Sequence, residues 1–326
     1  MKKKRIVFID SGCGGLHIMA KVQKLMPHYE LIYIADTFNA PYGNKTKRKL
    51  LVIARGLVEY INSHFNPEII VLACNTLTMN AISHLREEFY RTKFVGVEPA
   101  LKQARIYGGD TIIFATKSTL KHYKRLNKKI TAELKGEYEE NGLEFFDDDK
   151  IYRIAKKDCA RLVDENLDNL EVLNPFLEGI FAKPKYRNIE NIVLGCTHYV
   201  AIKEGINNVF ERVRFFDGTT GVANRIRDIA RFPKPRNSNP KGQKENGFEN
   251  NIEYVDKLTQ LPKNVKILTT DGDRRQQAKF ERYFIKLSNS WNIIKLIKKH
   301  LASARCCFFI NPFLFLVEVC LSKLIF

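Results

Sequence analysis

Two cysteines occupy matching positions in two similar stretches of the sequence, and they are the residues best placed to do chemistry. The stretch EIIVLACNT contains Cys74, and the stretch ENIVLGCTH contains Cys196. In each stretch, an apolar run and a small residue precede the cysteine, and polar residues that can open a helix follow it. A thiol at a helix N-terminus lies near unpaired N–H groups, which favour the thiolate. The pair therefore indicates proton transfer by two thiols, although a single such cysteine is more often a small buried hydrophobe.

A glycine-rich loop, DSGCGG at residues 10–15, follows the first apolar run. Such a loop lets a ligand approach the backbone closely and presents N–H groups to an anion. The spacing is not GxGxxG and the sequence has no GxxxxGK[ST], so a small carboxylate ligand suits the loop as well as a phosphate. Asp10 is placed to bind an ammonium group or to tune a nearby base. The alternative is a turn-forming Asp-Ser pair, and Cys13 is interpreted as incidental.

Other polar residues stand close to these motifs. His198 comes two residues after Cys196, where it can protonate a leaving group, assist the thiol or cap the helix, although a lone histidine is more often structural. Thr116 and Thr119 follow another apolar run, where hydroxyl groups would hold a carboxylate. Asp164 and Glu165 lie on a predicted helix, where solvated charges are the default interpretation.

The apolar runs predict a parallel sheet architecture. Most are nearly continuous, as expected of strands that are buried on both faces, and helical stretches separate them. Strand alternating with helix indicates an open, doubly wound α/β fold, in which ligands bind at the carboxyl ends of the strands. The helical stretches include residues 47–65, 77–90 and 159–181. The predicted strands are residues 5–9, 31–35, 68–73, 93–97, 111–115, 191–194, 213–216 and 265–268.

Length and composition allow two such domains. The chain has 326 residues, 44% of them hydrophobic, and a formal net charge of +18. The basic residues are spread along the chain without a nucleic-acid-binding signature, so we expect no nucleic-acid partner. The seven cysteines are irregularly spaced, without a CxxC or zinc pattern, so we expect free thiols and no metal. The N-terminus has no long apolar signal segment, which favours a cytoplasmic protein.

Two segments near the C-terminal end differ from the rest. Residues 233–251 are rich in Pro, Asn, Gly and Lys and predict a flexible linker or loop. Residues 306–326 are strongly apolar but contain Pro312, Glu318 and Lys323. A packed or oligomer-forming tail is favoured over a membrane anchor, so we expect no membrane partner.

Taken together, the motifs resemble those of glutamate racemases, within the aspartate/glutamate racemase superfamily. They occur in the family's order over about 210 residues. Two departures are Cys13, where a small aliphatic residue is common, and Val200, where proline is usual. The resembling motifs are DSGCGGL (10–16), PYG (41–43), ACNT (73–76), GVEPA (96–100), ATKST (115–119), GCTHY (195–199) and DG (217–218).

The resemblance implies two Rossmann-like, doubly wound α/β domains with the active site in the cleft between them. The first domain would comprise residues 1–98 and 209–287, and the second residues 99–208. The segment 233–251 would be a linker or loop, and residues 288–326 would form a C-terminal extension of unknown role.

The resemblance also implies roles for individual residues. Cys74 and Cys196 match the two catalytic thiols, and Asp10 and His198 match their assisting groups. A glutamate usually assists the histidine, and here either Asp164 or Glu165 would take that role. The residues that match substrate contacts are Asp10, Ser11, Tyr42, Gly43, Asn75, Thr76, Thr119, Thr197 and His198.

The implied activity is cofactor-independent conversion of L-glutamate to D-glutamate for peptidoglycan. It would use no pyridoxal phosphate, metal or nucleotide, and the enzyme would be a cytoplasmic homodimer. The alternatives are an aspartate racemase with the same fold and thiols, and a non-catalytic binding protein on the same scaffold. The size of the substrate pocket would distinguish an aspartate racemase from a glutamate racemase. Salt-sensitive DNA binding would favour the non-catalytic binding protein.

Overall fold

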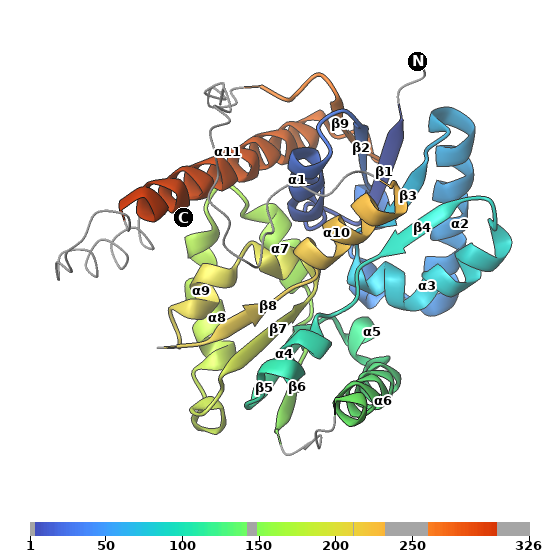
Figure 1. The fold of residues 1–326 in the computed structure, drawn as a ribbon. Coiled ribbons are helices and arrows are strands. Elements are labelled where there is room, and N and C mark those ends of the chain that lie inside the picture. Colours follow the sequence, from blue (N-terminus) through green and yellow to red (C-terminus); the bar gives the residue numbers. More distant parts are fainter. Residues whose placement is uncertain (1–3, 142–148, 211, 232–259, 305–326) are drawn as a thin grey trace, which may run out of the picture.

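Two parallel sheets, each flanked by helices, form two lobes of the molecule (Figure 1). The computed structural model describes residues 4–141, 149–210, 212–231 and 260–304. The predicted linker at 233–251 and the apolar tail at 306–326 therefore lie outside the described residues. Within the described part of the chain, no helix is long and apolar enough to cross a membrane.

The first lobe is built on a five-stranded sheet with the order β4-β3-β1-β2-β9, in which all neighbouring strands are parallel. Its strands are β1 (Arg5–Asp10), β2 (Glu30–Ala35), β3 (Ile69–Leu72), β4 (Lys93–Gly96) and β9 (Val265–Thr269). Its helices are α1 (Leu16–Leu25), α2 (Lys47–Phe65), α3 (Asn75–Glu88), α10 (Thr219–Ile229) and α11 (Arg274–Ala304). Helix α1 packs against α10 and α11, and α2 packs against α3.

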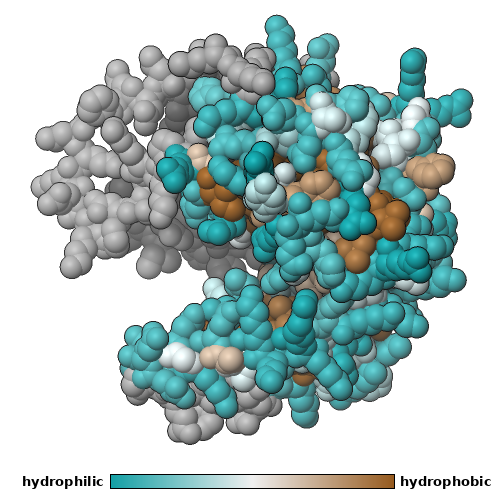
Figure 2. All heavy atoms as spheres, turned by 90° about the vertical axis from the view of Figure 1, so that its right-hand side faces the viewer, coloured by the Kyte–Doolittle hydropathy of each residue, from teal (hydrophilic) through white to brown (hydrophobic). Residues whose placement is uncertain are grey.

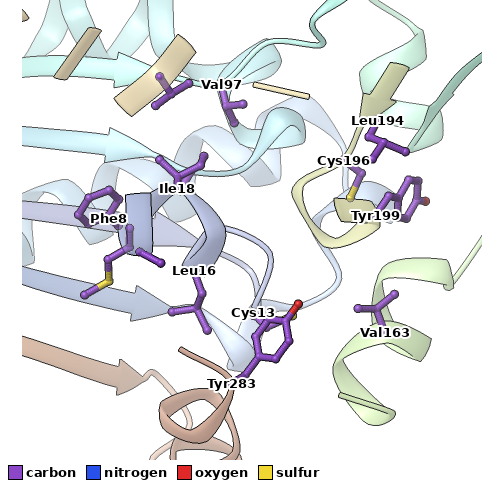
Figure 3. Packing of buried hydrophobic residues seen from close by; sticks show 14 of the residues in the cluster. Phe8, Cys13, Leu16, Ile18, Val97, Val163, Leu194, Cys196, Tyr199 and Tyr283 are labelled. Atoms are coloured by element: carbon purple, nitrogen blue, oxygen red, sulfur yellow. The ribbon is translucent and has the colours of Figure 1, made fainter. Parts of the chain in front are cut away.

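Both faces of this sheet are covered, which explains the continuous apolar pattern of its strands. Side chains of β1 alternate between two hydrophobic clusters. Ile6 and Phe8 pack with residues of α1, as Figure 3 shows for Phe8, whereas Val7 and Ile9 pack with residues of α2 and α3. A strand that is buried on both sides has no polar face, as the sequence predicted.

The second lobe has a four-stranded parallel sheet with the order β6-β5-β7-β8. Its strands are β5 (Thr111–Ala115), β6 (Ile151–Ile154), β7 (Asn191–Gly195) and β8 (Arg214–Phe216). Its helices are α4 (Leu101–Tyr107), α5 (Lys117–Leu120), α6 (Tyr123–Glu140), α7 (Cys159–Glu165), α8 (Asn174–Phe181) and α9 (Lys203–Asn207). Phe114 and Ile113 of β5 again face opposite clusters, so this sheet is also covered on both sides.

Helix α2 illustrates how closely local sequence can set an element. The predicted helix over residues 47–65 matches its bounds. The Thr46 side chain accepts a hydrogen bond from the Lys49 N–H at 3.3 Å, which caps the first turn. Asn66 follows the last turn in the left-handed conformation, with φ 45°, which commonly ends a helix.

Two details differ from the sequence-based expectation. The single helix predicted over residues 159–181 is divided into α7, the 3-10 helix η3 (Leu170–Leu173) and α8, because Pro175 in the first turn of α8 favours a new helix start. Strand β8 pairs with β7 in the second sheet. The second sheet therefore extends beyond residue 208, where the predicted second domain ended.

Candidate active site

Cys74 and Cys196 occupy equivalent positions in the two lobes. Cys74 follows β3 and is the N-cap residue of α3, and Cys196 follows β7 and is the N-cap residue of the 3-10 helix η5 (Thr197–Val200). Both have extended backbone torsion angles, and each residue is 5% exposed. Each thiol therefore stands at the carboxyl end of a parallel strand, which is the edge where open α/β sheets bind ligands.

The two thiols line one cavity of about 790 Å³. Residues of the first lobe form one side of it and residues of the second lobe form the other, so the cavity lies between the lobes. Its size is in the range of small-molecule sites. The predicted site residues that line it are Ser11, Tyr42, Gly43, Cys74, Thr76, Cys196 and His198.

The remaining predicted residues lie behind this lining rather than on it. They are Asp10, Asn75, Thr119, Asp164 and Thr197, and each either is next to a lining residue in the chain or forms a hydrogen bond with one. They are positioned to act on the lining residues.

The carboxylate of Asp10 is fully buried at the end of β1. It accepts hydrogen bonds from the backbone N–H groups of Ser11 at 2.7 Å and Gly15 at 2.6 Å. The Thr197 hydroxyl of the other lobe donates to it at 3.4 Å. The Tyr33 hydroxyl lies 3.3 Å from it and donates to the Gly12 carbonyl oxygen at 2.7 Å. Three donors thus compensate the loss of water around this carboxylate.

Burial shapes the proton affinity of the first thiol. Burial raises the pKa of Cys74 well above its ordinary value, and the negative charges of Asp10 and Cys196 raise it further. The backbone N–H of Leu77 at the start of α3 lowers that pKa, but it does not reverse the shift. Burial also raises the pKa of Asp10, against the opposing charge of His198. The start of α3 therefore lowers the pKa of Cys74, in the direction that the sequence predicted, but desolvation outweighs it.

The second thiol stands beside a histidine that is held by a carboxylate. Nδ1 of His198 lies 3.9 Å from Sγ of Cys196, and its Nε2 lies 3.2 Å from Oδ2 of Asp164. The neighbouring Glu165 instead pairs with Arg161 at 2.6 Å on the surface. The structure therefore brings Asp164, and not Glu165, into contact with His198.

This contact has the character of an ion pair. Burial lowers the pKa of His198, but the charge and hydrogen bond of Asp164 outweigh burial and leave that pKa well above its ordinary value. For Asp164, burial raises the pKa, but the charge of His198 and a 2.9 Å hydrogen bond from the Cys13 N–H leave it lowered. The donor atoms of Cys13, Asp164 and His198 lie within 4.8 Å of one another. Because a protonated imidazole is not a metal ligand, the group fits an ion pair better than a metal site.

The glycines of the first loop allow the two lobes to approach one another. A Cβ atom on Gly12 would overlap the Asp164 carboxylate and lie 2.7 Å from Nε2 of His198. A Cβ atom on Gly14 would lie 2.6 Å from Nδ1 of His198 and from Oγ1 of Thr197. The sequence predicted that this loop serves close approach by a ligand, and in the structure the close neighbour is the opposite lobe's own site segment.

A hydroxyl cluster joins the lobes on another side of the cavity. Oγ1 of Thr76 lies 2.8 Å from Oγ1 of Thr116 and 3.4 Å from that of Thr119. Behind it, the Asn80 amide donates to the Ser118 hydroxyl at 3.1 Å. These bonds link α3 of the first lobe to α5 of the second, so the position of each thiol is fixed relative to the other lobe.

Several residues at the site were not identified from the sequence. Tyr33 in the middle of β2 contacts Asp10, but its position within an apolar run gave no signal. Residues 155–158 and Cys159 line the cavity after β6, a strand that was not predicted from the sequence, and Tyr199 of η5 also lines it. Cys13, interpreted as incidental, donates its N–H to Asp164 and lies beside Tyr283 (Figure 3).

Two parallel α/β lobes that share a cavity, with one buried cysteine from each lobe, have the organisation of the aspartate/glutamate racemase superfamily. Known proteins agree with this class. A glutamate racemase of Clostridium botulinum is 37% identical over 232 residues, covering 69% of this chain and 83% of the relative. One of Clostridium perfringens is 31% identical over 265 residues, covering 76% and 90%. The chain therefore belongs to the glutamate racemase family and is an amino-acid racemase.

Solved structures agree with the fold. Escherichia coli glutamate racemase, in complex with L-glutamate and the activator UDP-MurNAc-Ala, is 25% identical with a TM-score of 0.59, covering 73% of this chain and 86% of that one. The Francisella tularensis enzyme, in complex with D-glutamate, superposes with a TM-score of 0.62 at 18% identity, covering 87% and 94%. No protein-family model matches the chain.

Proposed function

We propose that this protein interconverts L-glutamate and D-glutamate with Cys74 and Cys196 as the two proton-transferring groups, one on each face of the α-carbon. The observation that carries the proposal is that both thiols, one from each lobe, line the same cavity. The choice of glutamate as the substrate rests on the related proteins, which are glutamate racemases. Two of their solved structures contain bound glutamate.

The reaction needs one thiolate and one thiol. The thiolate on one face takes the α-proton, and the bonding pair stays on the substrate as a carbanion that is delocalised into the carboxylate. The thiol on the other face then donates its proton to the same carbon, which inverts the centre. The two sulfurs have exchanged protonation states at the end, so the reverse reaction starts from the product state. A thiol suits this work because its ordinary pKa is about 8.5, so both forms are accessible.

The surroundings of each thiol support distinct assignments. Asp10 is assigned to Cys74, whose pKa it raises together with burial, so it favours the form that donates a proton. His198 is assigned to Cys196, and as an imidazolium 3.9 Å away it stabilises negative charge on that sulfur. Asp164 is assigned as a positioning residue that holds the imidazole and its proton.

The carbanion is the costly species, and donors around the cavity would stabilise it. The cluster of Thr76, Thr116 and Thr119 offers hydroxyl groups at the lobe boundary. Asn75, which the family resemblance assigns to substrate contact, is next to the lining residue Cys74, and its buried Oδ1 has no hydrogen-bond partner among the described residues. Preorganised donors of this kind act most strongly where water is excluded.

The cellular setting is also part of the proposal. Working thiols must stay reduced, which favours a cytoplasmic enzyme. D-Glutamate would then supply peptidoglycan synthesis, and a homodimer is the assembly that the family resemblance implies. Light scattering after size-exclusion chromatography tests the dimer directly.

The activity is tested by incubating the purified protein with L-glutamate in deuterated water. We expect optical rotation to decay to zero while deuterium replaces the α-proton, without any added cofactor. L-Aspartate is the paired control, and it should react at least about tenfold more slowly if the pocket discriminates by one methylene. Faster racemisation of aspartate than of glutamate would assign the protein to aspartate instead.

A further inference from the structure

The mouth of the active-site cavity carries an unusual concentration of positive charge. Besides the catalytic groups, five lysines line the cavity, against a single acidic residue, Asp158, which is half-buried. Both lobes contribute to this group, which we call the lysine rim. The lysine rim consists of Lys45, Lys117, Lys121, Lys156 and Lys157.

The rim lysines are not compensated by neighbouring acids. Among the residues that the structure describes, none of the five forms an ion pair, whereas lysines elsewhere do, such as Lys102 with Glu137 at 2.6 Å. Asp158, the one acid on the lining, instead accepts a hydrogen bond from Asn44 at 3.3 Å. Unneutralised charge at the entrance of a partly closed cavity produces a positive potential inside it.

A second observation points in the same direction. Helix α2 begins at the cavity, since its N-cap residue Thr46 is part of the lining. Its first turn contains Lys47, Arg48 and Lys49 and no acidic residue. Cations at the N-terminus of a helix interact unfavourably with the helix dipole and therefore destabilise the helix slightly. They also add to the positive potential at the mouth of the cavity. Burial lowers the pKa of His122, and the charges of Arg125, Lys47 and Lys121 lower it further, which is consistent with a positive field there.

The face of the molecule that carries α2, α3 and α6 is predominantly hydrophilic (Figure 2). The lysine rim at this cavity therefore offers charge rather than an apolar surface. A free amino acid with two carboxylates and one ammonium group carries a net charge of −1 near neutral pH. It is attracted to such a rim, whereas a neutral amino acid of the same size is not.

We propose that the lysine rim is a specificity-determining feature that draws net-anionic amino acids into the cavity and lowers the KM for glutamate. The proposal rests on the proposed function, and it adds a determinant that acts before the substrate reaches the thiols. The rim lysines act through the potential of the mouth and take no part in proton transfer.

The test combines salt with charge reversal. Raising NaCl from about 20 mM to about 500 mM shortens the screening length several-fold, so KM should rise about 3- to 10-fold while kcat changes less than about twofold. The double variant Lys121→Glu/Lys157→Glu should show a similar rise in KM at low salt and a much weaker salt dependence. Both residues are exposed, so the fold should tolerate these changes.

A matched control has the same change in net charge outside the cavity. Lys183 and Lys263, one in each lobe, are exposed and are not part of the cavity lining. The variant Lys183→Glu/Lys263→Glu should therefore retain the wild-type KM and its salt dependence. Equal effects in the two double variants would overturn the proposal, because net charge alone would then explain them.

Calorimetric binding of L-glutamate separates this proposal from the catalytic one, because it needs no turnover. The dissociation constant should rise with salt and with reversal of the rim charges, in parallel with KM. A protein that racemises glutamate with a KM and a dissociation constant indifferent to both changes would contradict the lysine rim proposal and leave the two-thiol mechanism intact.

Discussion

The two thiols have the same place in their lobes but different surroundings. Cys74 begins a regular helix of 14 residues and lies near the buried carboxyl group of Asp10. Cys196 begins a 3-10 helix of four residues and lies near an imidazolium that Asp164 holds. The backbone therefore places both sulfurs in the same way, but acids and bases from other segments give them different electrostatic environments.

The difference suggests a division of labour. Burial and the negative charge of Asp10 raise the pKa of Cys74 and favour its thiol form, whereas the neighbour of Cys196 is a histidine that Asp164 holds. An enzyme with two identical thiol sites would need another way to break that symmetry. We expect substitutions on the two sides to differ in their pH dependence even where the loss of rate is similar.

The largest effect should follow removal of either sulfur. Cys74→Ala and Cys196→Ala should each reduce racemisation by more than about 10³-fold, since each removes a proton-transfer group that has no substitute on its face of the substrate. Optical rotation of L-glutamate and of D-glutamate measures the loss in both directions. The buried Cys159→Ala is the control, and it should retain activity within about tenfold. Near-normal turnover by Cys74→Ala would contradict the two-thiol assignment.

The next effect should come from the carboxylate that holds His198. Asp164→Asn should lower kcat about 10- to 100-fold. Burial would then lower the pKa of His198 against only the weaker opposing effects of Cys196 and Asp10, so the alkaline limb of the pH profile should move to lower pH. Glu165→Gln is the matched control, because Glu165 pairs with Arg161 on the surface. Equal pH profiles for the two variants would show that Asp164 does not act through His198.

The same substitution has a signature in stability. The His198 contribution is present below its unfolded pKa of about 6.5 and is lost as pH rises through its raised folded pKa. The Asp164 contribution is present above its unfolded pKa of about 3.8 and is lost as pH falls through its lowered folded pKa. The free energy of unfolding of Asp164→Asn should therefore differ most from wild type between about pH 4 and about pH 6.5, as urea titrations at several pH values would measure.

A smaller effect should follow from filling the gap between the lobes. Gly12→Ala would push a methyl group against Asp164 and His198, which should destabilise the protein by about 1–3 kcal/mol and reduce activity about tenfold. Gly56→Ala on α2 is the control, because a Cβ there meets nothing within 4 Å. It should stabilise the protein by about 0.5–1 kcal/mol. Thermal unfolding and racemase assays distinguish the two variants, and equal stability would contradict the close packing of this loop.

The smallest effect should follow from loosening the hydroxyl cluster. Thr116→Val removes the oxygen that lies 2.8 Å from Oγ1 of Thr76 and caps α5, which should cost about 1 kcal/mol of stability and a few-fold in KM. Thr131→Val is a comparison variant, because its hydroxyl bonds Arg105 away from the cavity. It should affect stability and leave KM unchanged. A wild-type KM in Thr116→Val would argue against substrate stabilisation by this cluster.

Much of the fold was predictable because apolar runs and helix ends are local signals. The eight predicted strands correspond to β1–β5 and β7–β9, and the Thr46 cap and Asn66 mark the two ends of α2. Strand β6 was not predicted because its sequence, IYRI, is short and includes an exposed Arg153. The residues that follow it form part of the cavity, so the missed strand also hid part of the site.

In the site, only the residues that lie within sequence motifs were predictable. Cys74, Cys196 and His198 lie within recognisable motifs, and the structure places them on one cavity. The choice between Asp164 and Glu165 depends on which side of a short helix faces His198, and it required the packing of α7. The raised pKa of Cys74 also depends on burial by the opposite lobe, which no local pattern encodes.

The central claim is tested most directly by following α-proton exchange in deuterated water with the two cysteine variants. A single remaining thiol can remove a proton from its own face and return a deuteron to that face, without inverting the centre. We predict that Cys74→Ala exchanges the α-proton of one enantiomer of glutamate only, and that Cys196→Ala exchanges that of the other. Exchange of the same enantiomer by both variants would contradict the placement of the two sulfurs on opposite faces.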